Sequence, residues 1–370
     1  MPPRPFQVAL ADSELSDLRT RLRHTRWPTT PPGVGWSQGV DPAYLREITT
    51  HWAEKFDWRG QEAHINTYQH FQVALSTADV HFIHHKAERD GVPIILTHGW
   101  PSTFLEYLPV IRPLTEAGFD VVVPSLPGYG FTTRPDQQHT LRDTARLWRE
   151  LMHSLGYRRF AAHGGDFGSG VTTFLALDHP DDLIGIHLTN LELDPYLGPG
   201  SDPLTEAERA LVEHEEEFVA RAGGYNLLQS TTPLTAGYGL SDSPVGLAAW
   251  VLEKWRAWSD CGGDLERFDR DLLLSTLTLF WVTNTITDSM RDFHDNRDLY
   301  DALTADDRVR VPTAIGLFDN EFAHHGRMPK SWAERLYDVR RWTEMPSGGH
   351  FAAVEEPQAL VDDLVEFFLS

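Results

Sequence analysis

The stretch His163-Gly164-Gly165-Asp166-Phe167-Gly168 follows a short apolar run that ends at Ala162, and an apolar helix is expected from Val171. Glycines on both sides of Asp166 permit a sharp turn between strand and helix, which can hold one side chain above the edge of a sheet. This is the outline of a Gly-x-nucleophile-x-Gly elbow with Asp at its centre. We interpret Asp166 as a nucleophile; the alternative is a solvated Asp that caps a helix N-terminus.

An aspartate at the centre of the elbow restricts the chemistry that the turn could perform. A carboxylate that attacks an acyl carbon forms an anhydride, which is a poor intermediate for ester hydrolysis. Attack on an sp3 carbon with a leaving group forms an alkyl ester instead, and water can cleave that ester at its carbonyl. The residue type therefore favours an epoxide or an alkyl halide as substrate. The second step needs a base, an acid that orients the base, and donors for the oxyanion.

Short runs rich in β-branched residues alternate with helical patterns around the elbow. Buried parallel strands are predicted over residues 93–97, 121–123, 160–162, 183–189 and 311–318, with a further strand over 340–345 and a helix over 142–155. Between about residues 195 and 305 the strand pattern is lost and helices are expected. The sequence predicts an α/β-hydrolase fold with a mostly parallel central sheet and an inserted helical cap.

The first 90 residues have a different pattern. A helix is expected near the N-terminus, capped by Asp12 or Ser13, and a second one over about residues 41–56. A pair of strands is expected over residues 73–84. The chain is therefore divided into an N-terminal extension (1–90), a first core part (91–195), a helical cap (196–305) and a second core part (306–370).

Composition excludes several classes of protein. The chain has 370 residues, a formal net charge of −22 and one cysteine, Cys261. The charge argues against binding of nucleic acid or anionic lipid, and one cysteine allows neither an intramolecular disulfide framework nor a cysteine metal cluster. We find no signal peptide and no apolar stretch long enough for a membrane span. We expect a cytoplasmic enzyme for a small, mostly apolar substrate, with no cofactor and no metal; whether it forms a homodimer stays open.

The oxyanion hole is expected from two backbone amides. His98-Gly99-Trp100-Pro101 directly follows the predicted strand over 93–97, where α/β-hydrolases place one of these donors. The amide of Trp100 and that of Phe167, the residue after the nucleophile, would form the pair. The alternative for this motif is an ordinary turn at a strand end.

The base is expected to be His350, which lies in a glycine-rich turn after the predicted strand over 340–345. The chain order nucleophile, acid, histidine is the α/β-hydrolase order. The acid is expected at Asp319 or Glu321, which both follow the strand over 311–318. Glu192 and Asp194, after the strand over 183–189, are a second candidate location.

Histidines also occur in clusters that could suggest a metal. They are His324-His325 and the group His81, His84 and His85. Neither cluster has a supporting carboxylate or cysteine, so no metal site is predicted.

Further motifs resemble those of the microsomal-type, or juvenile-hormone-type, epoxide hydrolases over nearly the whole chain. They are Thr25-Arg26-Trp27-Pro28, Phe56-Asp57-Trp58-Arg59, the His98 motif, and residues 124–131, 242–249 and 348–353. The resemblance implies conversion of an epoxide to a vicinal diol through an alkyl ester on Asp166, hydrolysed by water that His350 and Glu321 activate. It favours Glu321 because the family places its acid in a Phe-Pro-x-Glu/Asp loop. The missing N-terminal anchor suggests a soluble, bacterial-type member.

The resemblance also implies two cap tyrosines that hydrogen-bond the epoxide oxygen. Tyr225 matches the first of them. The second is expected within residues 290–296, where the nearest residues are Phe293, which cannot donate a hydrogen bond, and His294, which can. Two other functions stay open: a haloalkane dehalogenase, and a repurposed relative that binds or isomerises an epoxide-bearing or cyclic metabolite without hydrolysing it.

Overall fold

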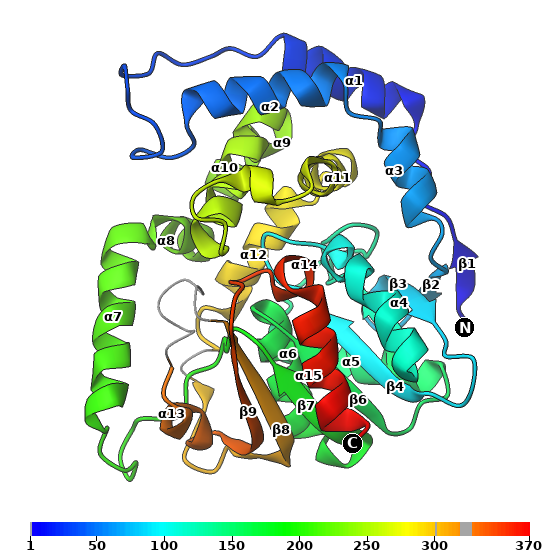
Figure 1. Cartoon of the computed structure of the whole chain (residues 1–370), viewed down its shortest axis with the longest axis vertical. Helices are drawn as coiled ribbons and strands as arrows, with labels where there is room; N and C mark the ends of the chain where they lie inside the picture. The colour runs from blue at the N-terminus through cyan, green and yellow to red at the C-terminus, as the bar shows by residue number, and fades with distance from the viewer. Residues whose placement is uncertain (1, 300–301, 319–327) are drawn as a thin grey trace.

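The computed structural model describes residues 2–299, 302–318 and 328–370. Within these residues, nine strands form one sheet in the order β1-β2-β3-β5-β4-β6-β7-β8-β9 (Figure 1). The strands are β1 (Arg4–Phe6), β2 (His70–Ala74), β3 (Asp79–His85), β4 (Val92–Thr97), β5 (Phe119–Pro124), β6 (Phe160–Gly164), β7 (Leu183–Leu188), β8 (Val309–Phe318) and β9 (Tyr337–Met345). Strands β4 to β9 pair in parallel, whereas β1, β2 and β3 extend the sheet in antiparallel pairing. The predicted α/β-hydrolase fold with a mostly parallel sheet is confirmed.

Helices cover both faces of the sheet. They are α4 (Leu108–Ala117), α5 (Leu141–Ser154), α6 (Phe167–Asp178), α13 (Lys330–Glu334), α14 (Ala352–Glu355) and α15 (Pro357–Phe368), with the short 3-10 helices η1 (Phe104–Tyr107) and η2 (Pro180–Asp182). Helix α4 packs with α15, and α5 packs with α6 (Figure 1). The central strands are buried on both faces, which explains their continuous apolar runs in the sequence. Loops at the carboxyl ends of these strands therefore meet at one edge of the sheet, beneath the cap.

The N-terminal extension begins in the sheet with β1, crosses the cap, and returns to the sheet. It contains α1 (Asp12–Arg23), α2 (Pro42–Glu54) and α3 (Trp58–Ile65), which contact cap helices, and then β2 and β3 (Figure 1). The predicted N-cap residues of α1, Asp12 and Ser13, are wrong, because the N-cap residue is Ala11. The backbone amide of Ala11 donates to Glu14 Oε2 (3.1 Å). Asp12 lies in the first turn instead, and its carboxylate pairs with Arg59.

The segment between β7 and β8 contains only helices among its described residues. They are α7 (Glu206–Ala222), α8 (Gly224–Thr231), α9 (Pro233–Asp242), α10 (Pro244–Trp258), η3 (Leu265–Arg267), α11 (Arg270–Thr283) and α12 (Ile286–Asn296). Helix α12 packs against α8 and α9. The division of the chain at residues 90, 195 and 305 stays a prediction. Across the described part of the chain, no helix combines the length and apolar character that a membrane span requires.

Helix α12 is tied to the core by a buried ion cluster. Arg134, in the loop after β5, contacts Asp292 through Nη1 (2.5 Å) and Asp295 through Nη2 (2.6 Å). The three side chains are only 3%, 8% and 6% exposed. Burial raises the pKa of Asp292 to about 6, although Arg134 acts in the opposite direction. The stability of this buried cluster therefore depends on the positive charge of Arg134.

Replacing Arg134 by Met is expected to destabilise the protein by about 3–5 kcal/mol, because two buried carboxylates would lose their counter-ion. Urea unfolding of wild type and variant measures this loss. Arg146→Met is the matched control: Arg146 pairs with Asp143 but its side chain is 57% exposed, so a loss below about 1 kcal/mol is expected. Equal losses in the two variants would contradict the interpretation.

Candidate active site

Asp166 lies in a strained turn between β6 and α6. Its backbone has φ 53° and ψ −133°, a conformation that non-glycine residues rarely adopt. Two glycines make room for it. A Cβ atom on Gly99 would collide with the carboxyl group of Asp166, and one on Gly168 would collide with the carbonyl oxygen of Thr97. The strain and the close packing hold the Asp166 carboxylate at the edge of the sheet.

The two carboxylate oxygens of Asp166 have different surroundings. Oδ1 accepts hydrogen bonds from the backbone amides of Trp100 (2.9 Å) and Phe167 (2.7 Å), the two residues predicted for the oxyanion hole. Oδ2 lies 3.4 Å from Nε2 of His350. One oxygen is thus held by two fixed donors, whereas the other faces the imidazole.

His350 lies in the loop between β9 and α14. Its backbone amide donates to the carbonyl oxygen of Trp258 on α10 (2.9 Å), and the two rings lie 5.0 Å apart. His350 is 5% exposed, so contacts from the cap and the core restrict its position. The predicted acids Asp319 and Glu321 lie outside the described residues, and the assignment of Glu321 stays a prediction.

Aromatic side chains from the cap cover the carboxylate. Tyr225 on α8 stacks on Trp100 with 5.7 Å between ring centroids and 5° between planes. Trp258 on α10 lies 5.2 Å from Tyr225. Phe293 on α12 lies 4.8 Å from Phe167 and 5.4 Å from Trp100. The structure therefore brings Asp166, His350, Tyr225 and the two oxyanion-hole residues together under one apolar roof.

Comparisons with known proteins agree with this geometry. Residues 3–107 match the family described as "Epoxide hydrolase N terminus", and residues 92–261 match "alpha/beta hydrolase fold". A relative from Stigmatella aurantiaca (strain DW4/3-1) is 39% identical over 98% of this chain and 84% of its own length. Epoxide hydrolase 1 of Sus scrofa is 35% identical over 98% of this chain and 88% of its own. The chain belongs to the epoxide hydrolase family.

A solved epoxide hydrolase supports the same assignment at the level of structure. The Aspergillus niger enzyme superimposes with a TM-score of 0.87 at 30% identity, over 99% of this chain and 96% of that one. The resemblance drawn from scattered motifs is thereby confirmed over nearly the full length. The roles of individual residues in this site stay predictions.

The described part of the roof contains no second cap tyrosine. His294 does not join it: its side chain is 47% exposed, and Nδ1 lies 3.3 Å from Asp295 Oδ1. Successive residues of a helix point about 100° apart, so α12 cannot direct both Phe293 and His294 at the nucleophile. Phe293, 8% exposed, faces Trp100 and Tyr225. The expectation that His294 assists Tyr225 does not fit this arrangement.

A buried carboxyl group near Asp166 was not predicted. Glu106 on η1 is 9% exposed, and burial raises its pKa to about 7, although a hydrogen bond with Ser102 and the charge of His350 act in the opposite direction. Asp166 and Glu355 also contribute to its environment, as like charges that raise the pKa. A signal was present in the sequence, since Glu106 is the one charged residue in the apolar run Phe104-Leu105-Glu106-Tyr107-Leu108.

Replacing Glu106 by Gln is expected to change how stability depends on pH. Because the folded-state pKa of about 7 exceeds the ordinary value of 4.5, the folded protein holds this proton more tightly than the unfolded chain. That stabilisation is complete below the unfolded-state pKa and is lost as the pH rises through the folded-state pKa. The variant should thus gain up to about 3 kcal/mol over wild type at pH 8 relative to pH 4.

Urea unfolding of both proteins across this pH range measures the difference. Glu54→Gln, at an exposed position of α2, is the control and should follow the wild-type profile. A Glu106→Gln profile parallel to wild type would show that Glu106 does not carry the proton.

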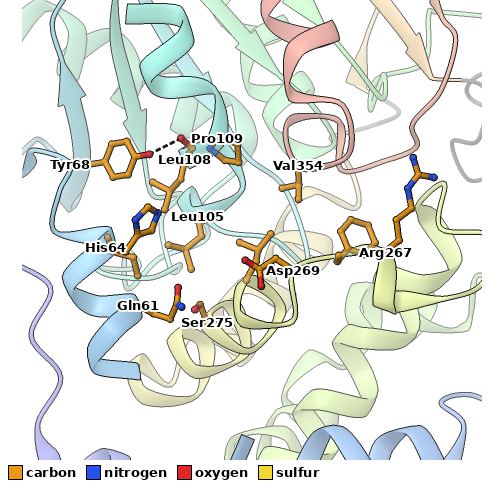
Figure 2. A pocket seen from close by; sticks show the side chains of 13 residues that line it. Gln61, His64, Tyr68, Leu105, Leu108, Pro109, Arg267, Asp269, Ser275 and Val354 are labelled. Carbon is orange, nitrogen blue, oxygen red and sulfur yellow. Dashed lines mark hydrogen bonds between the residues drawn. The ribbon is translucent and has the colours of Figure 1, made fainter. Parts of the chain in front are cut away.

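A cavity of about 410 Å³ is lined by residues of α3, η1, α4, α11 and α14 (Figure 2). Leu105 and Val354 line it on the core side, and Tyr68 donates to the carbonyl oxygen of Leu108 at its margin (3.0 Å). Asp166, His350 and Tyr225 are not among its lining residues. Leu105 and Val354 immediately precede Glu106 and Glu355 in the chain, and Glu106 interacts electrostatically with Asp166 and His350.

Proposed function

We propose that this protein hydrolyses a small, mostly apolar epoxide to a vicinal diol. The observation that carries the proposal is the unequal surroundings of the two oxygens of Asp166. Oδ2, beside His350, attacks a ring carbon, and the carbon–oxygen bond breaks with its electron pair on the epoxide oxygen. Tyr225 donates to that oxygen. The product is an alkyl ester whose carbonyl oxygen is Oδ1, already held by the amides of Trp100 and Phe167.

The second step uses the same oxyanion hole. His350 removes a proton from water, and the hydroxide attacks Cγ of Asp166 while the two amides stabilise the charge that develops on Oδ1. The bond between Cγ and Oδ2 breaks, and Oδ2 takes the proton from His350 and leaves as a hydroxyl of the diol, whereas the water oxygen stays in the carboxyl group of Asp166. Glu321 is proposed to orient His350. An aromatic roof and a net charge of −22 suit a neutral, apolar substrate rather than an anionic one.

Single turnover of an epoxide panel in water labelled with ¹⁸O tests the mechanism. With enzyme in excess, the label should enter the peptide that contains Asp166, and the first diol formed should carry none. Label in the first diol would contradict a covalent intermediate. Binding without turnover across the panel would favour a relative that does not hydrolyse epoxides.

We also propose that the protein acts in the cytoplasm, in keeping with its one cysteine, Cys261, which is buried and unpaired. A homodimer is the proposed assembly. Light scattering during gel filtration tests it, since a monomer has a mass of 41.9 kDa.

A further inference from the structure

The roof over Asp166 contains a single hydroxyl donor among its described aromatic residues. Three cap side chains contact Trp100 or one another there: Tyr225, Trp258 and Phe293. Trp258 has an indole and Phe293 has no polar atom, so Tyr225 is the one phenol of this group. Tyr225 is therefore the hydroxyl of this group that can donate to an alkoxide developing above Asp166.

A buried cation lies against that phenol. Nζ of Lys254, on α10, is 4.6 Å from the centroid of the Tyr225 ring, and Lys254 is 8% exposed. Lysine is rarely buried to this degree, and a desolvated ammonium interacts with an aromatic face more strongly than an exposed one. Its carboxylate partner is the adjacent Glu253, whose side chain is 33% exposed, so water screens that carboxylate more than it screens the ammonium.

We propose that Lys254 is a positioning residue for ring opening, acting through Tyr225 to make the phenol a stronger donor to the epoxide oxygen. As the carbon–oxygen bond breaks, the proton shifts from the Tyr225 hydroxyl to that oxygen, and negative charge develops on the phenol ring. A positive charge above the ring stabilises that developing phenolate. After ester hydrolysis, the carboxyl group of Asp166 releases a proton, and that proton restores the phenol of Tyr225. The enzyme therefore has no net gain or loss of protons over one turnover.

This inference rests on the proposed function, and it concerns the first chemical step alone. The step can be isolated in a His350→Gln background, where the alkyl-enzyme accumulates and its rate of formation is read directly by rapid quench and intact-protein mass spectrometry with styrene oxide. Lys254→Met removes the charge and keeps most of the side-chain length. It is expected to slow adduct formation about tenfold, whereas Lys254→Arg, which keeps the charge, should stay within about threefold of the parent.

A double-mutant cycle separates electrostatic support of Tyr225 from a structural role. Tyr225→Phe alone should slow adduct formation on the order of a hundredfold, and Lys254→Met should then add less than about twofold, because its partner hydroxyl is gone. Lys55→Met, at an exposed position, is the matched control and should leave the rate unchanged. If Lys254→Met unfolds, as judged by thermal melting, Lys254→Gln takes its place in the cycle.

The possible outcomes test the role of Lys254 separately from the proposed epoxide hydrolysis on which it rests. Adduct formation in the parent with no slowing in Lys254→Met, or equal slowing with and without the Tyr225 hydroxyl, overturns the role of Lys254 alone. Absence of any adduct in the parent overturns the proposed function and the role of Lys254 with it. Slowing that depends on Tyr225 and is rescued by arginine supports both.

Discussion

Replacing His350 by Gln is expected to trap the protein as an alkyl ester on Asp166. The first step needs no base, because a carboxylate attacks the ring carbon directly and Oδ1 is held by two amides. The second step needs a group that accepts a proton from water, and glutamine cannot do so. Loss of a general base slows a step by roughly 10²–10⁴-fold. Ester formation should therefore outrun hydrolysis, and turnover should stop after about one equivalent.

Intact-protein mass spectrometry provides the measurement. The variant should gain the mass of one epoxide, and peptide mapping should place the gain on the Asp166 peptide. His24→Gln, an exposed histidine at the end of α1, is the matched control and should retain turnover without an adduct. If the wild type converts an epoxide and the His350→Gln variant never gains its mass, the covalent mechanism is wrong.

Replacing Asp166 by Ala is expected to have the largest effect on activity. It removes the attacking oxygen, and losses on the order of 10⁶-fold accompany removal of a catalytic nucleophile. Alanine is preferable to asparagine, since water activated by His350 could hydrolyse an amide at this position and restore the carboxylate. The measurement is diol formation from an epoxide that the wild type converts.

Two further variants make this result specific. Asp181→Ala, at an exposed position after α6, should keep wild-type turnover. The double variant Asp166→Ala with His350→Gln should gain no mass from the epoxide, which would place the adduct on Asp166. A mass gain in the double variant would assign the nucleophile to another residue.

Much of the fold could be predicted from local patterns. The continuous apolar runs coincide with β4 to β8, and the helical pattern over 142–155 coincides with α5 (Leu141–Ser154). Strand β1 (Arg4–Phe6) was not predicted, because three residues carry no period and their pairing with β2 joins positions such as Arg4 and Gln72. The N-cap of α1 was also wrongly predicted, since the helix is capped at Ala11, before both Asp12 and Ser13.

The sequence by itself determined the elements of the catalytic centre whose chemistry is local. Asp166 between glycines indicates a nucleophile in a turn between strand and helix, and the segments around Trp100 and His350 follow strands whose carboxyl ends must meet at one sheet edge. The positions of these residues are set by short turns next to strands, so they can be predicted from the local sequence pattern.

Only the tertiary structure decided which side chains surround that nucleophile. The rotation of α12, held by the ion cluster at Arg134, directs Phe293 and not His294 into the roof. The packing of α8 against other elements of the cap brings Lys254 to Tyr225, and the position of η1 buries Glu106. Helix rotation and contacts between distant segments depend on the packing of the whole core, and no local pattern of residues contains them.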